Sequence, residues 1–463
     1  MAPWRNVNTL REAIAAENPA SDAALLGKQA SIAFAELSGG STLAHAQSAL
    51  RGRSVLIHAA SQLAAATALI ELDGIARRIV LCTPDLTPAQ LAGVAETAGA
   101  EAVVTDNPDP VLPSLPHHLI SPRPAPRAAS RESVLETEWI LMTSGTTGTP
   151  KLVRHSLHSL AGALATVPAV EGRRVWSTFY DMRRYGGLQI FLRAVRGGAS
   201  MLLSDAGEPA QEFLARAARA GVTHLSGTPS HWRRALMSGA AHLIDPAYVR
   251  LSGEIADQAL LDRLRGAYPR ASIGHAFAST EAGVAFDVND GLAGFPTEYL
   301  DGPRDGIELR VVDGTLRVRS RRNAAGYLNS SEDVIRDADG FVDTGDLVEL
   351  ENGRCHFRGR RGGVINVGGL KVHPEEIESV LNADPRVRMS RARARRNPIT
   401  GSVVIAEVVA AAGAADEEAI GALKRDLLQT CRRALAAHKV PVTLSFVPAL
   451  ELTAAGKLVR PGA

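Results

Sequence analysis

Apolar segments of strand length alternate with segments of helix length along the first 130 residues, and this alternation limits the folds open to the chain. The stretches 53–60 (RSVLIHAA), 77–83 (RRIVLCT) and 100–106 (AEAVVTD) have the short apolar runs of buried strands. Between them, 61–74 (SQLAAATALIELDG) and 88–100 (PAQLAGVAETAGA) have the length and composition of helices. Strand–helix–strand alternation predicts a parallel sheet with helices on both faces.

The pattern changes twice further along the chain. After a Pro- and Arg-rich surface connection at 107–133, the alternation continues from 135 to about 280, and 307–350 then turns β-rich. The Gly-rich stretch 359–370 leads into a compact α+β pattern. A chain of 463 residues is too long for one core. We therefore predict an α/β fold class with three parts. These are a large N-terminal domain of parallel-sheet α/β subdomains plus a β-rich subdomain (1–359), a hinge (360–363) and a small mobile α+β C-terminal domain (364–463).

Charge and cysteine content exclude several classes of protein. The formal net charge of +2 gives no electrostatic footprint for nucleic acid or an anionic membrane. The first residues lack the apolar core of a secretory signal, and no window reaches the roughly 18 apolar residues that span a bilayer. Cys82, Cys355 and Cys431 show no metal-ligand spacing. A reduced, cytoplasmic setting is expected.

Lysine is scarce in this chain, because nearly all of its 51 basic residues are arginines. The lysines are Lys28, Lys151, Lys371, Lys424, Lys439 and Lys457. Where only a surface charge is needed, the chain uses Arg. A retained Lys is therefore a candidate for a role that needs a compact ammonium on a flexible stem.

A run of small and hydroxyl-bearing residues directly follows a predicted strand at 143–151. It reads Thr143, Ser144, Gly145, Thr146, Thr147, Gly148, Thr149, Pro150, Lys151. Small residues let successive backbone N–H groups approach phosphate oxygens, and the hydroxyls add donors. The spacing is not that of a Walker A loop. The run predicts a phosphate-binding loop with Lys151 as its mobile cation; the alternative is a polar turn.

This loop resembles the signature of the adenylate-forming superfamily, which includes acyl-CoA synthetases, luciferases and the adenylation domains of peptide synthetases. Further segments match in the right order over nearly the whole chain, although Leu152 stands where the family usually has Gly. The resemblance implies a ligase that uses ATP and Mg²⁺ to convert a carboxylic acid into an acyl-adenylate with release of pyrophosphate. The acyl group then passes to a thiol, with coenzyme A or a carrier-protein phosphopantetheine as acceptor.

Two segments resemble the nucleotide-binding motifs of the family core. The first is 277–281 (FASTE). The resemblance implies that Thr280 bonds the α-phosphate, that Glu281 holds Mg²⁺ and that Phe277 stacks on the adenine. Phe277 and Ala278 replace the usual Tyr and Gly. The segment Ser252-Gly253-Glu254 resembles the loop that passes the adenine; whether Glu254 itself touches nucleotide stays open. For Glu281 the alternative is a solvated turn carboxylate.

The remaining motifs lie in the last third of the chain. Asp346, in Thr344-Gly345-Asp346, resembles the ribose-binding Asp, with Arg360 as its partner on ribose or phosphate; the alternative is a structural Asp in a β-turn. Gly362 replaces the hinge Asp or Lys usual in the family. The segment 367–376, with Gly368, Gly369 and Lys371, resembles the loop that enters the site for thiol transfer; the alternative is a Gly-rich hairpin before a helix.

Lys457, in Leu452-Thr453-Ala454-Ala455-Gly456-Lys457, resembles the family's catalytic lysine near the C-terminus. It would bridge the substrate carboxylate and the α-phosphate as charge builds up, together with Thr280, Glu281 and Lys151. Terminal lysines are usually solvated, but the Gly-Lys context and the scarcity of Lys favour the catalytic reading.

The acid pocket is predicted from three stretches, 179–188, 226–231 and 275–279. Its candidate residues are Tyr180, Asp181, Tyr185, Gly186, Gly187 and Ser279. Asp181 has two readings. It would bind the α-amino group of an amino acid, or it would pair with Arg183 or Arg184. We favour an aliphatic or aryl acid over an amino acid.

The sequence does not identify the small carboxylic acid or the thiol acceptor. Segment 367–376 favours coenzyme A, and loading of an acyl carrier protein is the alternative. A catalytically silent nucleotide-binding protein is a reading of another class, motivated by Leu152, Ala278 and Gly362. A luciferase-like oxygenase is a further reading that no residue requires.

Overall fold

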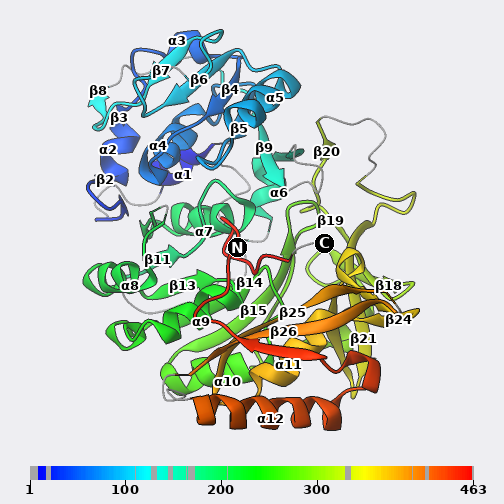
Figure 1. Ribbon diagram of the computed structural model, residues 1–463. Helices are drawn as coiled ribbons and strands as arrows, with labels where there is room; N and C mark the ends of the chain where they lie inside the picture. Colours follow the sequence, from blue (N-terminus) through cyan, green and yellow to red (C-terminus); the bar gives the residue numbers. More distant parts are fainter. Residues whose placement is uncertain are drawn as a thin grey trace.

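The computed structural model describes residues 9–16, 22–109, 111–126, 133–143, 150–162, 164, 173–205, 207–328, 335–398, 400–411 and 417–460. The chain forms two α/β units, a β-rich unit and a small α+β unit (Figure 1). The predicted α/β fold class, with its large N-terminal and small C-terminal parts, is confirmed.

The first α/β unit is built on a seven-stranded sheet of order β20-β10-β9-β5-β4-β6-β7. Its strands are β4 (Ser54–Ile57), β5 (Arg78–Leu81), β6 (Ala102–Thr105), β7 (His117–Leu119), β9 (Glu138–Thr143), β10 (Lys151–Ser156) and β20 (Gly326–Tyr327). Strands β9, β5, β4, β6 and β7 are parallel, whereas β10 and β20 add antiparallel pairs at one edge. Ile57 and Ile79 pack on the side of α4 (Gln62–Leu72), and Leu56 and Val80 pack on the side of α5 (Pro88–Ala98). The prediction of helices on both faces is therefore correct.

The second α/β unit contains an eight-stranded sheet of order β16-β15-β14-β13-β11-β12-β1-β2. Its strands are β1 (Ala24–Leu26), β2 (Ser31–Ala33), β11 (Val175–Thr178), β12 (Ser200–Leu202), β13 (His224–Gly227), β14 (Tyr248–Ser252), β15 (Ser272–Ser279) and β16 (Gly283–Val288). Its helices are α7 (Tyr185–Arg196), α8 (Ala210–Arg219), α9 (Pro229–Met237) and α10 (Gln258–Ala267). The central strands are parallel, so their carboxyl ends meet at one edge.

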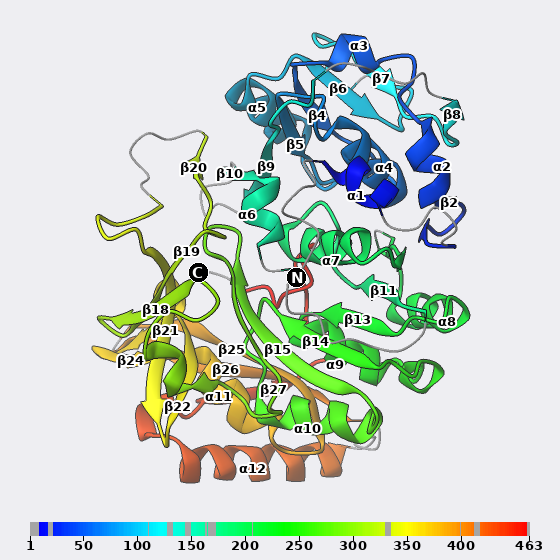
Figure 2. The same ribbon diagram turned by 180° about the vertical axis from the view of Figure 1, so that it is seen from behind.

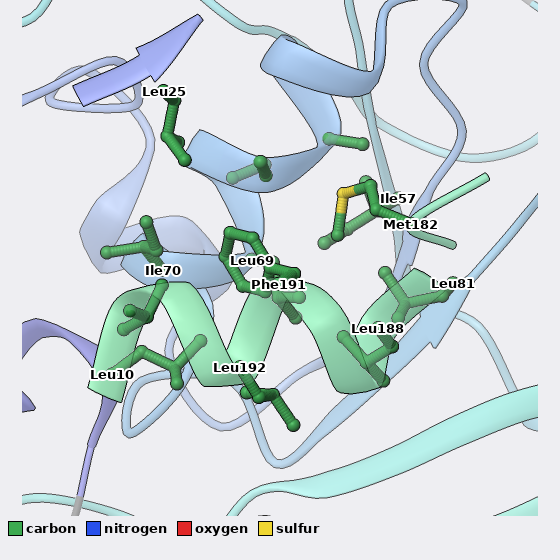
Figure 3. Packing of buried hydrophobic residues seen from close by; sticks show 14 of the residues in the cluster. Leu10, Leu25, Ile57, Leu69, Ile70, Leu81, Met182, Leu188, Phe191 and Leu192 are labelled. Carbon is green, nitrogen blue, oxygen red and sulfur yellow. The ribbon is translucent and has the colours of Figure 1, made fainter. Parts of the chain in front are cut away.

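Helix α7 joins the two α/β units. Its residues Leu188, Phe191 and Leu192 are fully buried. Figure 3 shows Phe191 beside Leu69 of α4 and Leu188 beside Leu81 of β5, and all belong to one apolar cluster. One continuous apolar core therefore spans both sheets and holds the two α/β units together.

Shorter elements complete this part of the chain. They are α1 (Leu10–Ala16), α2 (Phe34–Gly39), α3 (Gln47–Leu50), α6 (Leu157–Ala161), β3 (Gly40–Ser41) and β8 (Ala125–Pro126). The connection predicted at 107–133 thus carries two short strands, β7 and β8, at its described positions.

The predicted β-rich segment forms a five-stranded antiparallel sheet of order β17-β22-β21-β19-β18. Its strands are β17 (Phe295–Pro296), β18 (Ile307–Val312), β19 (Thr315–Ser320), β21 (Val342–Glu351) and β22 (Arg354–Arg360). A short 3₁₀ turn, Arg361–Gly363, follows β22 and leads into the C-terminal part.

The C-terminal part has its own hydrophobic core, which runs from Ile365 to Leu444. Its elements are β23 (Ile365–Val367), β24 (Leu370–Val372), α11 (Pro374–Asn382), β25 (Val387–Asn397), β26 (Gly401–Ala410), α12 (Glu417–Ala434) and β27 (Thr443–Phe446). Figures 1 and 2 place α12 at the far edge of the molecule, while the chain after β27 (red) turns back toward α9 and β14. Within the described residues, no helix is both long and apolar enough to span a membrane.

Candidate active site

The predicted phosphate loop lies between two paired strands. Thr143 ends β9 and Lys151 begins β10, and the two are direct partners in the antiparallel ladder. Ser144, Gly145, Thr146, Thr147 and Gly148 fall outside the described residues. The ladder nevertheless brings both ends of the loop to one point at the edge of the sheet.

Glu281 and Lys151 meet at Tyr327, which the sequence analysis did not single out. The Tyr327 hydroxyl donates to Glu281 Oε1 at 3.2 Å. Lys151 Nζ lies 4.8 Å from the centroid of the Tyr327 ring. The two predicted charged residues therefore contact the same aromatic side chain, although they are 130 positions apart in the chain.

His155 holds the turn that carries Thr280. Its Nε2 donates to the carbonyl oxygen of Thr280 at 2.7 Å, and its Nδ1 lies 3.0 Å from Ser159 Oγ. Burial lowers the pKa of His155 to about 4 against the opposing effect of the Thr280 contact, so the ring is neutral. Ser279 Oγ accepts from the N–H of Ala282 at 2.9 Å, which fixes the other side of the turn.

The carboxylate of Glu281 has the chemistry that Mg²⁺ prefers, because hard oxygen ligands suit this ion. Within the described ranges, no group of three or more His, Cys, Asp and Glu side chains could hold a metal by itself. A Mg²⁺ ion at Glu281 would take its other ligands from phosphate oxygens and water, which is its usual mode of binding.

The Ser252–Glu254 turn begins at the last residue of β14, and Ser252 and Glu254 each have a hydrogen-bond partner. The Ser252 carbonyl accepts from the Tyr180 hydroxyl at 2.7 Å. Gly253 has a positive φ of 87°. Glu254 accepts from the N–H of Ser230 at 2.9 Å, so its carboxylate occupies the N-terminus of α9. Glu254 therefore bonds to other residues of the protein; its contact with nucleotide, which the sequence left open, stays a prediction.

Asp346 and Arg360 are opposite partners in the β21–β22 ladder. Arg360 Nε lies 3.4 Å from Asp346 Oδ1, and its Nη2 donates to the Thr344 carbonyl at 2.9 Å. Burial raises the pKa of Asp346, while Arg360 and Lys457 oppose that shift. The two side chains are therefore neighbours, and their contact with ribose or phosphate stays a prediction.

Phe277 belongs to an aromatic cluster. Its ring stacks on Phe357 with centroids 5.0 Å apart and on Phe286 with centroids 5.8 Å apart. Ala278, next in the chain, packs against the main core. The stacking partners fix the Phe277 ring in place; adenine contact at this ring remains a prediction.

Lys457 is carried to this site by a short hairpin, residues 452–458, which we call the tail hairpin. Leu452 and Leu458 form its closing bridge. Burial lowers the pKa of Lys457, and the acidic groups that oppose the shift are Glu254, Asp346 and Glu281. By its accessible surface, Lys457 nevertheless remains an exposed residue. The Lys457 side chain lies against the Ser252–Glu254 turn, where a Cβ at Gly253 would be 3.3 Å from Lys457 Cε and 3.8 Å from its Nζ.

Gly368, Gly369 and Lys371 are not part of this assembly. They lie in the β23–β24 hairpin and are exposed. Gly368 and Gly369 have φ of 59° and 87°, as a two-residue hairpin turn requires. The Gly368 N–H donates to Thr400 within the C-terminal part at 2.9 Å.

The predicted acid-pocket residues lie between the end of β11 and the first turn of α7, apart from Ser279, which ends β15. Tyr180 is buried, and the Cβ position of Gly186 would lie 3.6 Å from its ring. Tyr185 is also buried, and burial raises its pKa. A side chain at Gly187 would meet the backbone of Asp181 at 2.2 Å, so only glycine fits there.

Asp181 is fully engaged by Arg183. Its two oxygens accept from Arg183 Nε at 2.8 Å and Nη2 at 2.6 Å. The Arg183 side chain has no exposed surface, and it also donates to the Ala59 carbonyl. Arg184 pairs with Asp85 instead. The geometry favours the salt-bridge reading of Asp181 over recognition of a substrate amine.

Asp181→Asn is expected to lower the free energy of unfolding by about 3–5 kcal/mol, because it leaves the Arg183 guanidinium buried without its counter-charge. Urea denaturation measures this. Asp85→Asn breaks the exposed pair with Arg184 and is expected to cost at most about 1 kcal/mol. Equal, small effects of the two variants would contradict the structural role of Asp181.

A polar layer lies beneath these residues, between α7 and the sheet. Arg250 Nε donates to Asp287 Oδ1 at 2.9 Å, and Arg193 Nη2 lies 4.0 Å from Asp287 Oδ2. Burial, reinforced by Arg250, lowers the pKa of Arg193 to about 10. Charged groups at this depth are unusual between a helix and a sheet.

Tyr327 and His155 contact predicted site residues but were not named from the sequence, whereas Thr228 and His231 lie in the predicted stretch 226–231. One signal was available for His155: it shares the alternation of β10 with Lys151, so both point to the same face of the strand. Tyr327 contacts Glu281 from 46 positions further along the chain, which no local pattern marks.

Two family models match the chain. The model described as AMP-binding enzyme covers residues 40–331, and the one described as AMP-binding enzyme C-terminal domain covers 376–457. The first match alone spans more than half of the chain. The chain therefore belongs to the AMP-binding enzyme family.

Among curated proteins, an isonitrile lipopeptide synthase from Streptomyces coeruleorubidus is 30% identical over 405 residues, which cover 81% of this chain and 26% of that protein. A 2-succinylbenzoate–CoA ligase from Salmonella typhimurium is 29% identical over 254 residues, covering 54% of this chain and 53% of the ligase. These matches thus span about a quarter and about half of the relatives' own lengths.

Among solved structures, an anthranilate CoA ligase, AuaEII, in complex with anthranoyl-AMP superposes with a TM-score of 0.83. The match covers 99% of this chain and 97% of that one at 19% identity. At this identity the likeness concerns the fold.

Proposed function

We propose that this chain activates a small carboxylic acid with ATP and Mg²⁺ as an acyl-adenylate, releases pyrophosphate, and transfers the acyl group to a thiol. Coenzyme A is the first candidate acceptor. The observation that carries the proposal is that the tail hairpin places Lys457 against the Ser252–Glu254 turn, where a Cβ at Gly253 would lie 3.8 Å from Lys457 Nζ. A cation at a predicted nucleotide-binding turn fits the formation of a mixed anhydride with phosphate.

In the first half-reaction, an oxygen of the acid attacks the α-phosphorus of ATP, and pyrophosphate leaves. Charge grows on the phosphorus oxygens during this step. The Lys457 ammonium compensates this charge, and the Thr280 turn, held by His155, positions the α-phosphate. Mg²⁺ at Glu281 would neutralise charge on the phosphates.

For the second half-reaction, we propose that the C-terminal domain (364–463) rotates about the hinge at 360–363. Lys457 would leave and the Gly368–Gly369 turn would enter. Two features support this division: the separate core of the C-terminal part, and the open surroundings of Gly362, where a Cβ would have no neighbour within 4 Å. Glycines in the entering turn would leave room for a narrow pantetheine arm.

An aryl acid is the substrate class that we place first. The Asp181–Arg183 pair removes the carboxylate that an amino acid would need. The similar proteins include ligases named for succinylbenzoate and anthranilate.

The acceptor stays between coenzyme A and a carrier protein, since both present the same phosphopantetheine thiol. One relative is named a CoA ligase and the other a lipopeptide synthase. We also propose that the protein works in the reduced cytoplasm. The three cysteines of the described chain are free and buried, which agrees with this setting.

Pyrophosphate release from MgATP, measured over a panel of aryl, hydroxyaryl, dicarboxylic, fatty and amino acids with and without coenzyme A, tests the proposal. Turnover that needs coenzyme A and yields acyl-CoA establishes the CoA ligase. A hydroxylamine-trappable adenylate without stimulation by coenzyme A favours a carrier protein. ATP binding without pyrophosphate release with any acid favours the silent nucleotide-binding protein.

A further inference from the structure

The tail hairpin is a preformed unit that carries Lys457 near its end. The Thr453 N–H donates to the Lys457 carbonyl at 2.7 Å, and the Gly456 N–H donates to the Thr453 carbonyl at 2.8 Å. The Lys457 N–H donates to Thr453 Oγ1 at 3.2 Å. These bonds fix the loop shape internally, so contacts with the rest of the protein have only to hold it in place.

Contacts with the N-terminal part flank Lys457 on both sides. The Thr228 hydroxyl donates to the Gly456 carbonyl at 2.7 Å. The Leu458 N–H donates to Glu254 Oε1 at 2.9 Å. Each bond joins residues more than 200 positions apart. On the hairpin side they involve Gly456 and Leu458, the two sequence neighbours of Lys457.

The third contact is steric. Gly456 lies against the His231 ring, where an added Cβ would be 1.8 Å from Cε1 and 2.0 Å from Nε2. Gly456 also has a φ of 69°. The hairpin therefore approaches the ring as closely as a glycine permits, and a larger residue at 456 requires His231 to move.

Thr228, His231 and Glu254, which we call the docking site, are held within the N-terminal part itself. Thr228 is the N-cap of α9 and accepts from the His231 N–H at 3.0 Å. Glu254 is fixed by the N–H and hydroxyl of Ser230. The His231 ring stacks on Phe179 at a centroid distance of 5.3 Å, and its Nδ1 accepts from the Thr228 N–H at 3.2 Å. The site is thus preorganised to receive the hairpin.

We propose that the docking site is the receptor that holds the tail hairpin during adenylate formation and releases it for thiol transfer. Thr228, His231 and Glu254 are positioning residues that act through Lys457. The inference rests on the proposed function, and it assigns to this chain a set of residues that control only the first half-reaction. The Glu254 carboxylate serves twice, because it binds the Leu458 N–H and lies near the Lys457 ammonium.

The first test is Gly456→Ala and its rescue. Gly456→Ala is expected to slow adenylate formation about 10- to 100-fold, because the new methyl group collides with the His231 ring. Thiol transfer from supplied acyl-AMP is expected to change less than about threefold. His231→Ala combined with Gly456→Ala is expected to recover at least about fivefold over the single variant, since the ring is gone.

The matched control is Gly353→Ala, which places a methyl group at a similar φ of 76° with no neighbour within 4 Å. It is expected to leave both half-reactions unchanged. An equal loss of both half-reactions in Gly456→Ala, or a double variant no faster than Gly456→Ala, would overturn the proposal.

The second test removes the acceptor. Glu254→Ala is expected to slow adenylate formation about 10- to 100-fold. Glu254→Gln keeps an oxygen that can accept the Leu458 N–H, so its adenylate formation is expected to be slowed less than that of Glu254→Ala. Hydrogen exchange of the full, ligand-free chain is expected to show about 10-fold faster exchange at the Leu458 amide in Glu254→Ala. Unchanged exchange at this amide would overturn docking through Glu254.

The exchange experiment also separates the two proposals. If the unaltered chain releases no pyrophosphate with any acid, the proposed function fails, whereas exchange at Leu458 that depends on Glu254 still supports docking. If the chain is active and exchange does not depend on Glu254, docking fails alone.

Discussion

Lys457→Ala is expected to slow acyl-adenylate formation by about 100- to 1000-fold, the usual effect of losing one preorganised charge-stabilising donor. The Lys457 side chain lies against the Ser252–Glu254 turn, with its Nζ 3.8 Å from the Cβ position of Gly253, and the proposed function has it compensate charge that develops on the α-phosphate. Because the residue acts in only one arrangement of the C-terminal part, thiol transfer from supplied acyl-AMP is expected to stay within about threefold of the unaltered rate.

The measurement is single-turnover pyrophosphate release, run beside transfer of the acyl group from synthetic acyl-AMP to the thiol. Lys424→Ala serves as a control, because Lys424 is an exposed residue of α12. A loss of both half-reactions in Lys457→Ala would show that this lysine does not alternate between two arrangements.

Gly369→Trp is expected to give the opposite pattern, with thiol transfer at least about 100-fold slower and adenylate formation nearly unchanged. Gly369 is exposed in the structure and a Cβ there would have no neighbour within 4 Å, so the docked arrangement tolerates a large side chain. A Trp ring in the turn would fill the space through which the pantetheine arm must pass. The φ of 87° at this position adds local strain in both arrangements.

Gly353→Trp is the matched control for that strain, since Gly353 also lies in an open turn with positive φ. It is expected to leave both half-reactions intact. Unaltered thiol transfer in Gly369→Trp would remove the β23–β24 hairpin from the path of the thiol.

The elements predicted from apolar runs agree with the structure because burial on both faces demands such runs. Strands β4, β5 and β6 and the helices between them follow the predicted ranges within a few residues. Strand β25 (Val387–Asn397) was missed. Its sequence, VRMSRARARRN, alternates Arg with small residues, and within it Val387 and Ala392 belong to the apolar core of the C-terminal part. Pairing with β26 and packing of α11 stabilise it, and neither is visible locally.

The motif residues could be named from the sequence because each sits in a short segment whose chemistry depends on neighbours in the chain. Asp181 is a residue whose partner could not be predicted from its neighbours in the chain. Its sequence context allows two partners, and the fold selects Arg183 by burying the guanidinium against the carbonyl of Ala59. Only the tertiary structure places the two at the start of α7.

The sequence by itself determined the order of strands and helices, the α/β class and the residues of the motifs, because hydrophobic period and loop chemistry are local properties. The tertiary structure alone decided which of these residues meet. The contact of Gly456 with His231, and the bond from the Leu458 N–H to Glu254, join parts of the chain more than 200 residues apart. Such contacts depend on how the C-terminal part packs against the rest, and packing is a property of surfaces that form only after folding.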